Sequence, residues 1–219
     1  MSDKRRYRLF FLSILGIPLV LFGSWLLVDR YQAPPILGPT TTNADGETVQ
    51  HVVAPFETID QLGRTVTNDA LAGSPYVASF FFTSCPVICP EMTVAIKEVQ
   101  DSYAADDLSF VSFSIDPERD TIARLKAFAE RFEVSHDNWH FVRADKDDIY
   151  RWARNEFMLT AIEGTAENND FIHSELVALV DADGHVRGFY DPTDASRRKE
   201  LMRDIDLLLE RSTPQNSPS

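Results

Sequence analysis

The stretch FFFTSCPVICP, residues 80–90, contains both cysteines of the 219-residue chain, Cys85 and Cys89. Residues 76–82 are apolar and rich in aromatic side chains, which predicts a short buried β-strand. Residues 90–103 predict a helix that begins at its proline, because the first helical position needs no N–H. We therefore expect both cysteines in the turn between a strand and the N-terminus of a helix.

This position favours chemistry at the two sulfur atoms. The free N–H groups and the dipole of a helix N-terminus stabilise a thiolate, which is both a nucleophile and a metal ligand. Soft sulfur ligands select Cu(I) over hard ions such as Mg²⁺. A structural zinc site needs four protein ligands, and the sequence has no paired motif for the other two. The pair thus predicts redox chemistry or a soft metal site, with a small-loop structural disulfide as the alternative.

Strands and helices alternate outward from this stretch. The alternation predicts an α/β fold with a mixed sheet flanked by helices, and a strand ending in a cysteine pair makes it thioredoxin-like. Asp120 and Asp145 are the expected N-caps of two of the helices. The other expected elements are a hairpin over 54–66 with its turn at Gly63, strands over 108–115, 139–143, 176–181 and 185–190, and helices over 121–132, about 145–157 and 195–210.

The first 28 residues predict a membrane anchor. Residues 9–28 carry no charge, and as a helix these 20 residues would span about 30 Å, the thickness of a bilayer's hydrocarbon core. A cleaved signal peptide is the alternative, although residues 31–33, Tyr-Gln-Ala, match a cleavage site poorly. A cytoplasmic N-terminus and a domain across the membrane are expected from the basic residues before the span, Lys4, Arg5, Arg6 and Arg8.

The composition of the chain limits which cellular compartment and which binding partners are expected. The net charge of −13, from 34 acidic and 21 basic residues, excludes nucleic acid because phosphate backbones would be repelled. No Arg- and Ser-rich transit peptide is present, so we expect a single-pass protein of the cell inner membrane with its domain in the periplasm. The mitochondrial intermembrane space is the eukaryotic equivalent. The predicted parts are a cytoplasmic tail (1–8), the anchor (9–28), a Pro- and Gly-containing tether (29–48), the folded domain (49–211) and a disordered tail (212–219).

Four further residues are candidates for the site. His173 follows a polar loop, and its spacing alone indicates a loop or core histidine. Asp116 and Asp120 indicate a turn and a helix cap, or else an acidic edge beside the cysteines. Met92 indicates helix packing, although its sulfur is soft. We expect structural or surface roles for the other histidines, His51, His136, His140 and His185.

Three motifs in this order resemble the SCO/SenC family. They are FFFTSCPVICP at 80–90, SIDPERDT at 114–121, and His-Ser at 173–174 ahead of LVDADG at 179–184. The members of that family are membrane-anchored, thioredoxin-like copper chaperones for cytochrome c oxidase assembly. The resemblance extends from about residue 55 to residue 209.

The resemblance implies a role for each candidate. Cys85, Cys89 and His173 would bind one copper ion, the two cysteines would also form the redox disulfide, and Asp116 and Asp120 would form the family's acidic motif. Many members have an aspartate directly before the histidine, where this chain has Ile172. The hydrogen bond that would orient the imidazole ring is therefore in question.

The implied function is that of a metallochaperone rather than an enzyme. It would take copper from a donor protein and deliver it to the binuclear copper site of oxidase subunit II or to another acceptor. The alternative is a thiol–disulfide oxidoreductase that acts on the cysteines of a metalloprotein partner, for which His173 would be dispensable. A peroxidase of the peroxiredoxin type is not supported, because Ala78 and Phe82 stand where its motif needs Pro and Thr.

Overall fold

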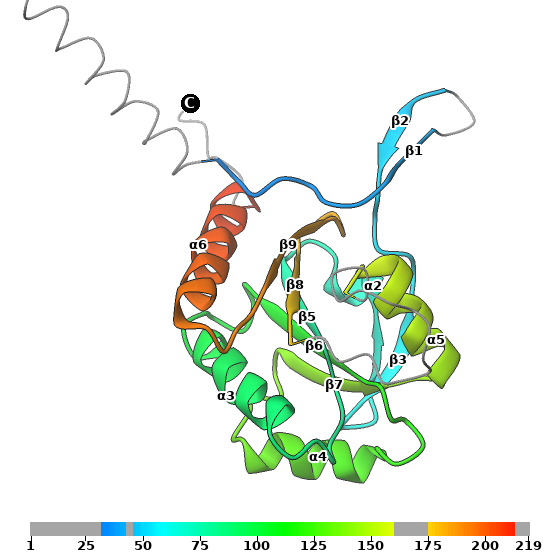
Figure 1. The fold of residues 1–219 in the computed structure, drawn as a ribbon, viewed down its shortest axis with the longest axis vertical. Helices are drawn as coiled ribbons and strands as arrows, with labels where there is room; N and C mark the ends of the chain where they lie inside the picture. The colour runs from blue at the N-terminus through cyan, green and yellow to red at the C-terminus, as the bar shows by residue number, and fades with distance from the viewer. Residues whose placement is uncertain (1–31, 43–45, 160–174, 213–219) are drawn as a thin grey trace, which may run out of the picture. The chain divides into compact units, whose positions relative to one another are not determined.

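A seven-stranded mixed sheet forms the centre of the computed structural model, which describes residues 32–42, 46–159 and 175–212 (Figure 1). The strand order is β4-β3-β7-β6-β5-β8-β9. Strands β5, β6 and β7 are parallel, and the other neighbouring pairs are antiparallel. The strands are β3 (Glu57–Asp60), β4 (Thr65–Thr67), β5 (Tyr76–Phe81), β6 (Ser109–Ser114), β7 (Trp139–Arg143), β8 (Val177–Val180) and β9 (Val186–Tyr190).

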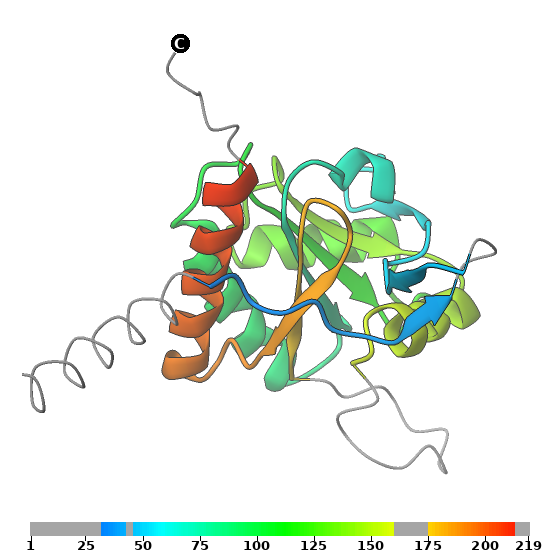
Figure 2. The same cartoon turned by 90° about the horizontal axis from the view of Figure 1, so that it is seen from above.

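Helices cover both faces of this sheet (Figures 1 and 2). One face packs against α3, α4 and α6, and the other packs against α2 and α5. Successive side chains of β5 enter opposite cores, so the strand is buried along its whole length, as the sequence predicted. The mixed sheet with flanking helices is therefore confirmed. The helices are α2 (Asn68–Leu71), α3 (Ile88–Gln100), α4 (Ile122–Arg131), α5 (Lys146–Arg151), the π-helical turn η1 (Trp152–Glu156) and α6 (Ala195–Ser212).

Two helix starts differ from the prediction. Helix α3 begins at Ile88, so Pro90 occupies its third position and Cys89 is already helical. Proline is tolerated there because no N–H in the first helical turn has an intrahelical acceptor. The N-cap of α4 is Thr121, whose side chain accepts a hydrogen bond from Arg124 N, and not Asp120. Asp145 stands at the N-cap of α5 as predicted, without a side-chain cap bond.

Part of the segment predicted as a tether is attached to the edge of the sheet. Leu37 N donates to Val186 O on β9 at 2.8 Å, and Arg187 donates from Nε to Pro34 O at 2.8 Å. The same guanidinium pairs with Asp181 at 2.9 Å. Two short strands, β1 (Thr40–Thr42) and β2 (Thr48–Gln50), follow as a separate exposed hairpin. Residues 29–48 have no periodic pattern of apolar residues, so the sequence did not predict these contacts.

The predicted anchor and His173 lie outside the described residues, as does the predicted tail apart from Ser212. Within the described ranges, every helix is too short or too polar to cross a membrane.

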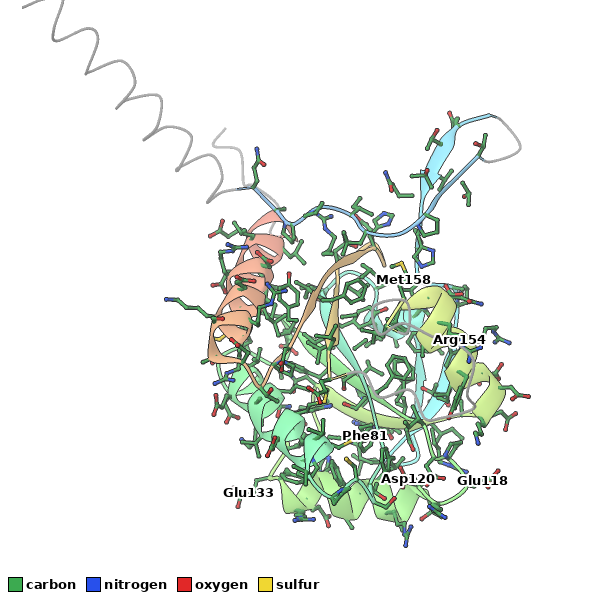
Figure 3. All side chains as sticks on the ribbon, in the orientation of Figure 1. Phe81, Glu118, Asp120, Glu133, Arg154 and Met158 are labelled. Atoms are coloured by element: carbon green, nitrogen blue, oxygen red, sulfur yellow. The ribbon has the colours of Figure 1, made fainter. Side chains whose placement is uncertain are left out.

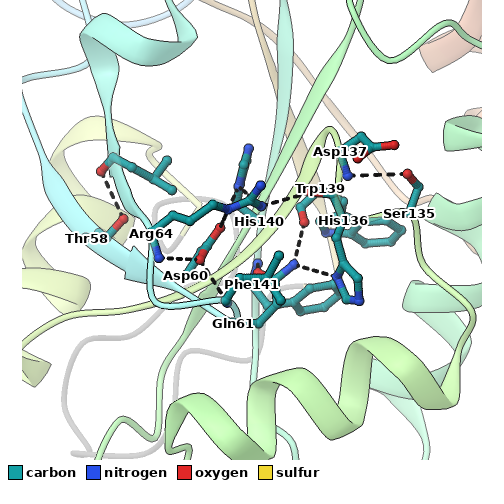
Figure 4. Close-up of polar contacts among 12 residues, drawn as sticks. Thr58, Asp60, Gln61, Arg64, Ser135, His136, Asp137, Trp139, His140 and Phe141 are labelled. Carbon is teal, nitrogen blue, oxygen red and sulfur yellow. Dashed lines mark hydrogen bonds and ion pairs between the residues drawn. The ribbon is translucent and has the colours of Figure 1, made fainter.

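A buried carboxylate joins the β3–β4 turn to β7 (Figure 4). The side chain of Asp60 is fully buried and accepts hydrogen bonds from Leu62 N, Arg64 N and Arg64 Nε at 2.9, 2.9 and 2.7 Å. His140 Nδ1 lies 3.1 Å from the same carboxylate. Gly63, with a φ of 78°, makes the turn possible. His140 thus has the structural role that the sequence predicted.

This cluster should make stability depend on pH. Burial lowers the pKa of His140, and the Asp60 carboxylate offsets this only in part. The unfolded chain therefore binds this proton more readily, so the free energy of unfolding should fall as pH drops below about 6.5. Burial acts to raise the pKa of Asp60, but its hydrogen bonds outweigh this and lower it, so its contribution is lost only below about pH 4. Denaturant unfolding between pH 7.5 and 5.0 should show a smaller loss in His140→Gln; equal losses would contradict this.

Candidate functional site

The two cysteines lie together where β5 passes into α3. Cys85 is half-buried in the connecting turn, and Cys89 is buried in the first turn of α3. Both are free thiols. Cys89 N donates a hydrogen bond to Cys85 Sγ, with the two atoms 3.3 Å apart. A backbone N–H of the helix N-terminus thus points at one of the sulfur atoms, as the sequence predicted.

The two sulfur atoms lie in different environments. Burial raises the pKa of Cys89 to about 12, and the neighbouring Cys85 and Asp120 also act to raise it. The expectation that the helix N-terminus favours the thiolate is therefore wrong for Cys89, because desolvation outweighs the helix dipole.

This asymmetry should appear in alkylation kinetics. Iodoacetamide at pH 8 should modify Cys85 at least about tenfold faster than Cys89, because Cys89 is only 6% exposed and its thiolate is disfavoured. Peptide mass spectrometry of partly modified, reduced protein measures the two rates. Equal rates in the folded protein would contradict the burial of Cys89, and equal rates in denaturant are the control.

An apolar pocket of about 260 Å³ opens beside the sulfur atoms. Aromatic side chains of β5 form much of its wall, and Met92 packs in the core beneath, which confirms its predicted packing role. Glu175 is the one charged residue among the described residues of the wall. The pocket keeps the sulfurs in an environment of low polarity. Its wall includes Phe81, Phe82, Cys85, Cys89, Met92 and Glu175.

Asp120 fixes the loop that carries Cys85. Its carboxylate is fully buried and accepts hydrogen bonds from Thr83 N at 3.0 Å, from Thr83 Oγ1, and from Ser114 Oγ at 2.6 Å. Figure 3 shows Phe81 and Asp120 at the same end of the sheet. The prediction of Asp120 as a helix cap is wrong because these donors draw its side chain inward. Asp120 therefore ties the cysteine loop to the end of β6.

Asp116 is placed differently. Its carboxylate lies 3.5 Å from the Arg119 guanidinium, and its backbone N–H donates to Ser114 Oγ at 3.2 Å. Arg143 of β7 donates to Pro117 O at 2.8 Å and so holds this loop to the sheet. Of the two aspartates, Asp120 is the one that the described contacts join to the cysteine loop.

Sequence reasoning missed Thr83 and Ser114 as partners of Asp120. A signal was present, because β5 and β6 were both predicted as consecutive strands joined through a helix. Such strands pair in parallel, and their carboxyl ends meet at one edge of the sheet. Residues that follow the two strands therefore meet at this edge, as Thr83 and Asp120 do, although Asp120 comes six residues after the end of β6 at Ser114.

The third predicted ligand, His173, lies outside the described residues. Within the described ranges, no group of three or more His, Cys, Asp or Glu side chains is placed to hold a metal ion. The described chain resumes at Glu175, in the wall of the cysteine pocket.

Comparison with known proteins gives one consistent result. The SCO1 protein homolog of Bacillus subtilis is 33% identical over 161 residues, which cover 72% of this chain and 82% of that protein. The structure of BsSco, a member of the Sco family of cytochrome c oxidase assembly proteins with a disulfide switch, matches with a TM-score of 0.63 and 32% identity, and covers 75% of this chain and 95% of that one. Copper-bound ScoI of Bradyrhizobium japonicum matches with a TM-score of 0.51 and 25% identity, and covers 72% and 99%. The SCO1/SenC family model matches residues 44–210, and this chain therefore belongs to the SCO1/SenC family.

Proposed function

We propose that this chain is a copper metallochaperone that binds one copper ion through Cys85, Cys89 and His173 and delivers it to the binuclear copper site of cytochrome c oxidase subunit II. The observation that carries the proposal is the pair of free sulfurs held together at an apolar pocket. Membership of the family supports it, since one relative binds copper and another belongs to the oxidase assembly proteins.

The described residues suit a soft cation. Thiolate sulfur prefers Cu(I) to hard ions, and the apolar wall offers no oxygen-rich shell for Mg²⁺ or Ca²⁺. The buried thiol of Cys89 ionises with difficulty alone, so a bound cation supplies the charge that stabilises its thiolate. Copper binding should accordingly release protons from the cysteines.

His173 is proposed as the third ligand because the resemblance to the family places the copper-binding histidine there, and its distance along the chain from the cysteine pocket is compatible with that role. It precedes Glu175 by two residues, and two extended residues span at most about 7 Å. Glu175 lines the pocket that holds both sulfurs. Strand β8 runs antiparallel to β5 with Ala78 opposite Ala178, and continuing that register brings Glu175 opposite Phe81, where the cysteine loop begins.

We extend the proposal to the surroundings of this site. Residues 9–28 anchor the chain in the inner membrane, and residues 1–8 stay in the cytoplasm. Residues 29–48 then connect the anchor to a thioredoxin-like domain (49–211) in the periplasm, or in the mitochondrial intermembrane space of a eukaryote, with Pro34 and Leu37 already attached to the edge of the sheet. Residues 212–219 form a polar tail. A separate copper donor loads the site.

A transfer experiment tests the function. The reduced, copper-loaded full chain is mixed with the copper-free soluble domain of oxidase subunit II. We expect copper to move to the acceptor, measured as the copper content of each protein after the two are separated under reducing conditions. An acceptor that gains no copper while the donor keeps its own would overturn the proposed delivery.

The pair of free thiols also supports a second candidate, a thiol–disulfide oxidoreductase. Cys85, the more exposed thiol and the acceptor of a backbone N–H, would attack a partner disulfide as thiolate. Cys89 would then attack the mixed disulfide, forming a Cys85–Cys89 disulfide while the partner gains two electrons and leaves as a dithiol. For this function Cys89→Ser should trap a covalent partner, and His173→Ala should have full activity.

A further inference from the structure

We propose that the outward face of α3 is the surface on which the copper acceptor docks. This inference rests on the proposed function and identifies the contact surface of the same site. We call this surface the α3 ridge and define it as Val87, Ile88, Glu91, Val94 and Glu98.

The α3 ridge is unusually apolar for a solvent-facing helix surface. The exposed positions of α3 are 88, 91, 94 and 98, a helical spacing that defines one face. Ile88 and Val94 on this face are 37% and 51% exposed, and the adjoining Val87 is 52% exposed. The outer face of an amphipathic helix normally carries polar residues, and exposed apolar groups that gather in one place mark interaction sites.

Two surface pockets lie beside α3. The cysteine pocket borders Val87 and Ile88. A second hollow, of about 460 Å³, borders Glu91 and Val94 and reaches Arg198 of α6. A partner that covers the α3 ridge can therefore fill space on both sides of it, which gives an interface both shape and apolar area.

The charges around the α3 ridge indicate a basic partner surface. The described walls of the two hollows contain three carboxylates, Glu91, Glu98 and Glu175, and one cation, Arg198. Arg198 pairs with Glu98 at 3.0 Å, so these two charges offset each other and the carboxylates of Glu91 and Glu175 are in excess in the described walls. The net charge of the whole chain is −13. An acceptor with an apolar contact patch and a rim of Lys and Arg complements this surface.

Ligand exchange explains why the acceptor, in particular, should dock here. Copper passes from the thiolates of one protein to the ligands of the other without a change of oxidation state, while protons return to the released cysteines. The acceptor's ligands must therefore approach Cys85, the more exposed sulfur. The apolar surface that directly adjoins Cys85 through Val87 and Ile88 is the α3 ridge.

A matched pair of variants tests the inference. Val94 lies outside the cysteine pocket, so Val94→Glu in the full chain should keep copper stoichiometry while it slows transfer to the subunit II domain by about tenfold or more. The control is Leu62→Glu in the β3–β4 turn, where a side chain that is 42% exposed gains the same charge. It should transfer within about twofold of wild type. Glu91→Lys adds an independent test, since it should slow transfer most at low salt.

The outcomes separate this inference from the proposed function. Transfer that slows in Val94→Glu and Glu91→Lys, but not in Leu62→Glu, supports docking at the α3 ridge. Transfer at wild-type rates in both ridge variants overturns the docking surface and leaves the proposed function intact. Absence of transfer from the wild type itself overturns the proposed delivery and the docking inference together.

Discussion

Replacing both Cys85 and Cys89 with serine is expected to abolish stoichiometric copper binding. The serine hydroxyl is a hard ligand that stays protonated near neutral pH, so it binds a soft monovalent cation poorly. Each single substitution should weaken binding by at least about 100-fold, because the remaining sulfur loses its partner ligand. Competition with a Cu(I) chelator under reducing conditions measures both effects.

Two controls make this result specific. Met92→Leu removes the soft thioether in the wall of the pocket and should leave copper binding unchanged, because Met92 packs in the core. Denaturant unfolding of each serine variant shows whether the fold persists. Binding of one copper ion by the folded double variant would put the metal site elsewhere in the chain.

Asp120→Ala is expected to lower the free energy of unfolding by about 3–5 kcal/mol. The carboxylate is fully buried and accepts hydrogen bonds from Thr83 N, Thr83 Oγ1 and Ser114 Oγ. Its removal leaves these donors without an acceptor inside the protein, and the unpaired backbone N–H of Thr83 frees the loop that carries Cys85. Urea unfolding measures the loss, and faster alkylation of Cys89 should accompany it.

Graded variants separate the contacts of Asp120. Asp120→Asn keeps one acceptor oxygen and should lose less stability than Asp120→Ala. Ser114→Ala removes one hydrogen bond and should lose about 1–2 kcal/mol. A loss below about 1 kcal/mol in Asp120→Ala, with Cys89 alkylation unchanged, would show that this carboxylate does not support the cysteine loop.

The hydrophobic pattern predicted the sheet well because it depends on local periodicity. Strand β7 (Trp139–Arg143) was predicted at its observed bounds, and β5 ends one residue earlier than expected. The start of α3 was harder to predict, because Val87 at its N-cap forms no side-chain cap bond. The structure buries Cys89, Met92 and Ile96 on the inner side of α3. Their spacing of three and four residues in the sequence is helical and favours a start before Pro90.

Three features of the structure depend on tertiary contacts and could not be predicted from the local sequence. Asp120 and Thr121 are both good N-cap residues, and only the donors from Thr83 and Ser114 draw Asp120 away from the cap. The raised pKa of Cys89 likewise depends on burial, which helix-terminus reasoning alone does not reveal. The attachment of Pro34 to Arg187 depends on a contact across more than 150 positions of the chain.

A copper site with three ligands requires the imidazole of His173, so copper stoichiometry and affinity in His173→Ala are the decisive measurement. Wild type, His173→Ala and the control His136→Ala are fully reduced and titrated with Cu(I) against a competing chelator. We predict one copper ion per chain in wild type and in His136→Ala, and binding weaker by about 100-fold or more in His173→Ala. Equal affinity in His173→Ala and wild type would contradict the three-ligand site and favour the thiol–disulfide oxidoreductase.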